Sequence, residues 1–156
     1  MKKGIDVSKH NGTIDWEKAK SGLDFAMLRI GFGGDISSQD DVQFNRNVSE
    51  CERLGIPWGG YLYSYALNTS QAQSEAKHAI RLLKGKTPTY PIFIDMEDAD
   101  GYKAKHGGIP SRSTNTAIVK TFCEALKAEG YKTGYYCNKD WYKNRLNPSE
   151  LDYDFW

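Results

Sequence analysis

Cysteine is scarce in this chain of 156 residues. The three cysteines, Cys51, Cys123 and Cys137, are odd in number and far apart, so they match neither a disulfide framework nor the paired spacing of a zinc site. We therefore expect three buried side chains that behave as small apolar groups.

Histidine is equally sparse, and the three histidines have no metal-binding spacing. His78 lies inside a helical pattern, and we expect its side chain to be on the surface. His10 follows shortly after Asp6 and is a candidate for contact with a substrate. The sequence therefore predicts no metal site.

The sequence also lacks a long apolar run and an excess of charge of either sign. No segment approaches the roughly 18 apolar residues of a membrane span, and the first residues, MKKG, lack the apolar core of a secretion signal. The 21 Lys and Arg nearly cancel the 20 Asp and Glu, which leaves a net charge of +1. A field this weak favours neither nucleic acid nor a membrane surface as a partner.

What the sequence does contain is an alternation of short apolar runs and amphipathic helical patterns. Strands are predicted at 4–7, 25–30, 58–66, 90–96 and 133–137, and 153–156 resembles the opening of a sixth. Helices are predicted at 15–20, 41–54, 70–83, 114–129 and 141–146, with Ser70 as the N-cap of the third. Five βα units indicate a single α/β domain, residues 1–156, with a parallel sheet and outer helices. We expect a TIM-like (β/α) barrel from which the final three strands are missing.

Two carboxylates end the apolar run PIFIDMED at 91–98. Residues i and i+2 of a strand point to the same face, so Asp95 and Glu97 project together from its carboxyl end. Asp6 ends the first strand, GIDVS, in the same way. Because the carboxyl ends of all barrel strands surround one mouth, three carboxylates are predicted around one cleft. Crowding and burial raise the pKa of such groups, and a protonated acid beside an ionised one is what glycoside cleavage requires.

Aromatic side chains follow the same strand ends. Tyr61, Tyr63 and Tyr65 alternate along the third strand, and Tyr135 and Tyr136 end the fifth. Rings at these positions are suited to stacking on sugars, although the alternating set is equally suited to filling the barrel.

Each of these patterns also has a purely structural interpretation. A DxE at a strand end is compatible with a helix cap or a turn. Asp98 and Asp100 fall in the following loop and are expected to be solvated, and Asp15 is expected to cap a helix. A chitinase-like hydrolase also ends a barrel strand in DxE, but the longer DxxDxDxE run is absent, since PIFI precedes Asp95.

Several motifs together resemble the family 25 glycoside hydrolases, the Chalaropsis-type lysozymes. They occur in the family's order over nearly the whole chain: GIDVS at 4–8, NG at 11–12, IDW at 14–16, FAMLRIG at 25–31, GYLYSYA at 60–66, IDME at 94–97 and GYYCN at 134–138 followed by Trp141. The resemblance implies a muramidase that hydrolyses the β-1,4 bond between N-acetylmuramic acid and N-acetylglucosamine in peptidoglycan glycan strands, with no cofactor. Its action would lie outside the cell or at the bacterial cell wall, and phage-type release suits the absence of a signal peptide.

The resemblance also implies roles for individual residues. Glu97 matches the general acid/base, Asp95 the partner that assists the substrate's own 2-acetamido group, and Asp6 an acid that holds the charge of the site. Tyr63 and Tyr136 match aromatic sugar contacts, and Tyr61, Tyr65 and His10 are further candidates.

The sequence departs from the family pattern after Trp156, where the last barrel strands, a WQY-like segment and a fourth active-site Asp are expected. This departure motivates a second hypothesis, an inactive domain that binds glycan or self-associates through an open barrel edge.

Overall fold

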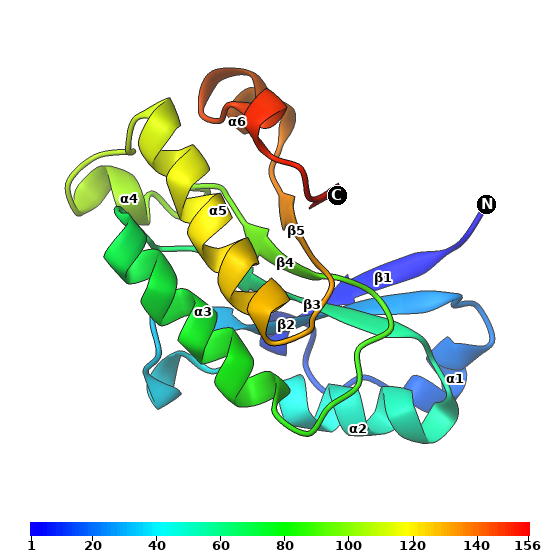
Figure 1. Cartoon of the computed structure of the whole chain (residues 1–156). Coiled ribbons are helices and arrows are strands. Elements are labelled where there is room, and N and C mark those ends of the chain that lie inside the picture. Colours follow the sequence, from blue (N-terminus) through cyan, green and yellow to red (C-terminus); the bar gives the residue numbers. More distant parts are fainter.

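The sheet is all-parallel, and each strand pairs with the next one in the chain. The computed structural model describes all 156 residues (Figure 1). The strands are β1 (Gly4–Val7), β2 (Phe25–Phe32), β3 (Trp58–Tyr63), β4 (Ile92–Asp95), β5 (Thr133–Tyr136) and β6 (Asp154–Phe155), in the spatial order β1 to β6. Sequential winding of this kind is the arrangement of a (β/α) barrel, whereas a doubly wound sheet reverses its strand order. The predicted α/β class with a parallel sheet is confirmed.

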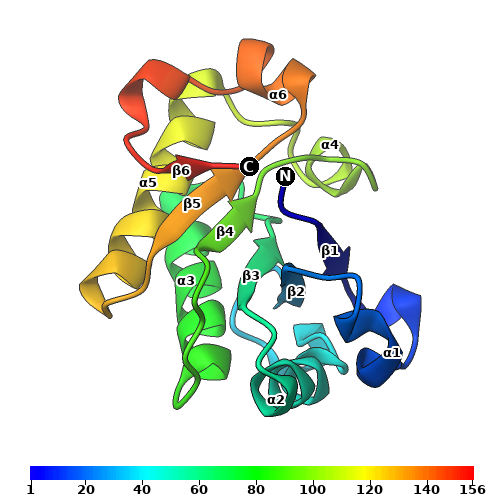
Figure 2. The same cartoon turned by 90° about the vertical axis from the view of Figure 1, so that its right-hand side faces the viewer.

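The longer helices lie on one side of this sheet. They are α2 (Phe44–Leu54), α3 (Thr69–Leu83) and α5 (Arg112–Ala128). The short helices are α1 (Trp16–Lys20), α4 (Tyr102–Lys105) and α6 (Lys139–Asn144), with 3-10 turns at Lys9–Asn11, Ser37–Gln39 and Pro148–Glu150. Figures 1 and 2 show α2, α3 and α5 along the outer side of the sheet, with α6 near the carboxyl end of β5. None of these helices is both long and apolar enough to cross a membrane.

Alternation along β4 explains how one strand serves both the core and a polar cleft. Ile92 and Ile94 are fully buried and belong to the main apolar core. Phe93 and Asp95 point to the other face of the pleated strand, where the Phe93 ring lies 5.6 Å from that of Trp156. The helices therefore cover one face of the sheet, and the other is left for the site.

Side-chain caps set the helix boundaries. Asp15 caps α1 as predicted, since its carboxylate accepts a hydrogen bond from the Lys18 amide. The prediction of Ser70 as the cap of α3 is wrong, because the Asn68 side chain accepts from the Gln71 amide at 2.9 Å and the helix begins two residues earlier. For the same reason α5 begins early, since Ser111 caps it.

Two further expectations are corrected. His78 is fully buried, not on the surface, because its ring nitrogens lie 3.0 Å from the Gly33 carbonyl oxygen and 2.8 Å from Asp40 Oδ1. The third strand ends at Tyr63 and not at 66, so Tyr65 lies beyond it. The three cysteines are buried and unpaired, as predicted.

Candidate active site

A cleft of about 310 Å³ opens at the carboxyl ends of the strands. Its lining residues come from β1 to β5 and from the end of the chain: Asp6, Arg29, Tyr61, Tyr63, Asp95, Glu97, Tyr136 and Trp156. The three predicted carboxylates therefore face one cavity, which we call the carboxylate cleft. No group of three or more His, Cys, Asp or Glu side chains is placed to hold a metal ion.

Asp95 and Glu97 form the acidic centre of the carboxylate cleft. Asp95 ends β4 in register with Tyr63 on β3 and Tyr136 on β5, and it is 6% exposed. Burial, with the Glu97 carboxylate beside it, raises the pKa of Asp95 to about 8. No group donates a hydrogen bond to the buried Asp95 Oδ1. A negative charge on Asp95 is therefore disfavoured beside the Glu97 carboxylate.

Four aromatic rings surround these carboxylates. Trp156 contacts two of the other rings, since its ring centroid lies 5.2 Å from that of Tyr136 and 6.0 Å from that of Tyr61. The Tyr63 hydroxyl accepts a hydrogen bond from the Ala99 amide at 3.1 Å, which fixes this ring against the loop after β4. Tyr61, Tyr63 and Tyr136 thus lie where the sequence placed sugar contacts.

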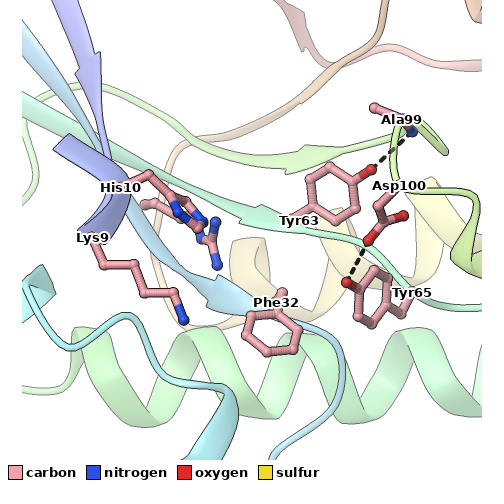
Figure 3. A pocket seen from close by; sticks show the side chains of 8 residues that line it. Lys9, His10, Phe32, Tyr63, Tyr65, Ala99 and Asp100 are labelled. Atoms are coloured by element: carbon pink, nitrogen blue, oxygen red, sulfur yellow. Dashed lines mark hydrogen bonds between the residues drawn. The ribbon is translucent and has the colours of Figure 1, made fainter.

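The other two candidates, His10 and Tyr65, lie in a second cavity of about 490 Å³, which we call the side pocket. Its lining residues are Lys9, His10, Arg29, Phe32, Tyr63, Tyr65, Ala99 and Asp100. Figure 3 shows Lys9 and His10 on one wall, Tyr65 and Asp100 on the other, and Phe32 between them. Arg29 and Tyr63 belong to both cavities, so the side pocket adjoins the carboxylate cleft.

Asp98 and Asp100, which were expected to be solvated, form hydrogen bonds that hold the loop after β4 in place. Asp98 is half-buried and accepts hydrogen bonds from the amides of Lys103 and Ala104 at the start of α4. Asp100 is exposed, but its Oδ2 accepts from the Tyr65 hydroxyl at 2.6 Å. These contacts fix the segment that carries Glu97.

Two buried residues of opposite charge, Glu75 and Lys103, both contact Ser64. Glu75 accepts hydrogen bonds from the Ser64 hydroxyl at 2.8 Å and from the Tyr65 amide at 2.7 Å. The Lys103 ammonium donates to the carbonyl oxygens of Ser64 and, at 3.2 Å, Glu97. Both charged residues are almost fully buried, so burial raises the pKa of Glu75 to about 7 and lowers that of Lys103. This network supports the backbone on both sides of the acidic centre, because the Ser64 amide also donates to the Asp95 carbonyl oxygen.

Four residues near the site were not predicted from the sequence: Arg29, Trp156, Glu75 and Lys103. The sequence marks some of them more clearly than others. Arg29 is the one charge within the β2 segment FAMLRIGF, which marks it as functional or paired. Trp156 was read as the opening of a strand. Glu75 and Lys103 look like ordinary surface charges in helical segments, and only the packing of α3 and α4 shows their burial.

Comparison with protein families gives one match that spans the chain. The family model described as glycosyl hydrolases family 25 matches residues 5–156. No curated protein matches the sequence.

Solved structures share this fold. The modular autolysin LytC from Streptococcus pneumoniae, in complex with a synthetic peptidoglycan ligand, matches with a TM-score of 0.81 and 33% identity over 92% of this chain and 34% of LytC. A family 25 glycosyl hydrolase from Bacillus anthracis matches with a TM-score of 0.78 and 25% identity over 98% of this chain and 68% of that one. A muramidase from Trichobolus zukalii shares the fold at 19% identity, with a TM-score of 0.72 over 90% of this chain and 67% of that one. The chain spans about a third of LytC and about two thirds of the other two proteins.

Proposed function

Since the chain belongs to the glycosyl hydrolases of family 25, we propose that it hydrolyses the β-1,4 bond between N-acetylmuramic acid and N-acetylglucosamine in peptidoglycan. Its place of action is the bacterial cell wall. The observation that carries the proposal is the meeting of Asp6, Asp95 and Glu97 in one cleft, where burial and the neighbouring Glu97 raise the pKa of Asp95.

Asp95 at the end of β4 and Glu97 in the loop that follows have different roles in glycoside cleavage. Glu97 protonates the oxygen of the leaving sugar and later activates water. Asp95, more deeply buried, passes its proton to Glu97 as the substrate binds. As a carboxylate it then accepts a hydrogen bond from the N–H of the substrate's 2-acetamido group, whose carbonyl oxygen attacks the sugar carbon. Asp6 holds the positive charge that develops at that carbon. No metal or organic cofactor takes part.

The aromatic rings hold the glycan against these acids. Tyr61, Tyr63 and Tyr136 present ring faces and hydroxyl groups around the carboxylate cleft, an arrangement suited to the apolar faces and polar edges of sugars. The structure of LytC with a synthetic peptidoglycan ligand supports a wall glycan as the substrate class. For residues 1–156 we propose a single, incomplete catalytic domain with part of a TIM-like barrel, which the sequential order of the six strands supports.

Digestion of purified peptidoglycan tests this function through the identity of the new reducing ends. We expect borohydride reduction of the products to convert N-acetylmuramic acid to its alditol. N-acetylglucosamine alditol would identify another glycosidase and contradict the proposal. Binding to the wall without any new reducing end would favour a glycan-binding domain that lacks activity.

A further inference from the structure

The side pocket differs from the carboxylate cleft in the hydrogen-bonding groups that it leaves free. Its one carboxylate, Asp100, is held by partners within the chain. Asp100 accepts from the Tyr65 hydroxyl and from the Tyr102 amide, one bond to each carboxylate oxygen. Asp41, which lies behind Arg29, accepts from the amides of Lys9 and Gln43.

The Lys9 ammonium, in contrast, has no partner in the chain, and Arg29 has one long carboxylate contact. Lys9 is exposed, and its ammonium lies 5.9 Å from the Phe32 ring without a hydrogen bond or ion pair in the chain. The Arg29 guanidinium lies 5.5 Å from the same ring, and its one carboxylate contact is a 3.5 Å approach of Nε to Asp41 Oδ2. The His10 ring adds a further polar group on the Lys9 wall, as Figure 3 shows.

Two cationic side chains and a single hydrogen-bonded carboxylate favour an anion in the side pocket. A carboxylate only accepts, and guanidinium and ammonium groups are its strongest partners. The aromatic floor of Phe32 and Tyr63 suits a ligand that carries this carboxylate on a partly apolar stem.

We propose that the side pocket binds a carboxylate on the 3-O-substituent of N-acetylmuramic acid while the glycan occupies the carboxylate cleft. This inference rests on the proposed function, and it makes carboxylate-bearing wall glycan the preferred substrate over neutral glycans of the same backbone. Lys9 and Arg29 are the charged contacts. The carboxylate comes from one of two sources, the lactyl group itself or the peptide attached to it.

The proposal is tested by measuring kcat and KM of the wild type and of the Lys9→Gln variant with three glycan substrates that differ in their carboxylates. They are glycan strands with their peptides, strands freed of peptides by an amidase so that the lactyl carboxylates are exposed, and strands whose carboxylates are capped as methylamides. For strands with the recognised carboxylate, Lys9→Gln is expected to raise KM about fivefold with kcat changed less than twofold, as for the loss of one partly exposed charged contact. Lys20→Gln, at an exposed lysine on α1, is the matched control and should leave both constants unchanged.

Capping distinguishes a charge contact from a general loss of binding. With methylamide strands the wild type should show the raised KM, and Lys9→Gln should add nothing. An effect on peptide-bearing strands alone assigns the peptide carboxylate, and an effect on stripped strands assigns the lactyl group. Equal KM values of the wild type for capped and uncapped strands would overturn the proposal, as would an equal effect of Lys9→Gln on both.

A binding measurement keeps this test separate from the test of activity. N-acetylmuramic acid and its methylamide are titrated into the wild-type protein, with NMR shifts of the Lys9 and His10 backbone as the readout. Shifts with the acid and not with the amide support the anion site even when no strand is cleaved, in which case only the proposed function fails. Identical shifts with both probes, or none with either, contradict the anion site.

Discussion

Replacing Glu97 with Gln is expected to lower kcat for peptidoglycan hydrolysis by about 10³-fold, the loss typical of removing a general acid. Gln has nearly the same shape but no acidic proton to give to the leaving oxygen. KM should change little, because the group acts on the transition state more than on bound substrate. The rate is measured as release of reducing ends from purified wall.

A matched exposed glutamate controls for the substitution. Glu129→Gln, beyond the end of α5, should retain the wild-type rate, and both variants should unfold at the wild-type temperature. Full activity in Glu97→Gln would remove this residue from the mechanism. A fall in activity accompanied by a fall in unfolding temperature would show a structural role instead.

Replacing Lys103 with Met is expected to lower the free energy of unfolding by about 3 kcal/mol. The reason is that Glu75 is then left buried without the positive charge of Lys103. For a domain of this size that decrease in free energy corresponds to a fall in Tm of about 6–12 °C. The methionine fills much of the same space, but Glu75 loses its buried counter-charge, and the carbonyl oxygens of Ser64 and Glu97 lose a donor. Thermal unfolding at pH 7 measures the effect.

The chain provides its own control two residues later. Lys105 is exposed on α4, so Lys105→Met should leave the unfolding temperature within about 1 °C of the wild type, as is usual for surface changes. Adding Glu75→Gln to Lys103→Met should recover part of the lost stability, because it removes the stranded charge. Equal unfolding temperatures for Lys103→Met and Lys105→Met would show that the buried pair contributes nothing measurable.

The alternation of side chains made the acidic centre predictable from sequence. Asp6 and Asp95 lie at the carboxyl ends of apolar strands and Glu97 lies just beyond, and the meeting of parallel strand ends then places them in one cleft. Strand ends were less predictable, because pairing with neighbours decides where a strand stops. Tyr65 continues the alternation of Tyr61 and Tyr63 in sequence, yet it lies beyond β3 in the side pocket.

Burial of charge could not be predicted in the same way. Lys103 and Lys105 are alike in local sequence, but Lys103 is buried and Lys105 is exposed. The difference depends on how the short helix α4 turns toward Ser64, which is a tertiary contact. His78 was misplaced for the same reason, since its partners Gly33 and Asp40 come from a distant loop.

The pH titration of the Asp95 carboxyl carbon by NMR tests most directly whether two acids share a proton in this cleft. The account predicts a midpoint near pH 8 in the wild type, because burial and the neighbouring Glu97 both disfavour a second negative charge. In Glu97→Gln the midpoint should fall, since only burial then remains to raise it. A wild-type midpoint near the ordinary aspartate value of about 3.9, or one unmoved by Glu97→Gln, would contradict the shared acidic centre.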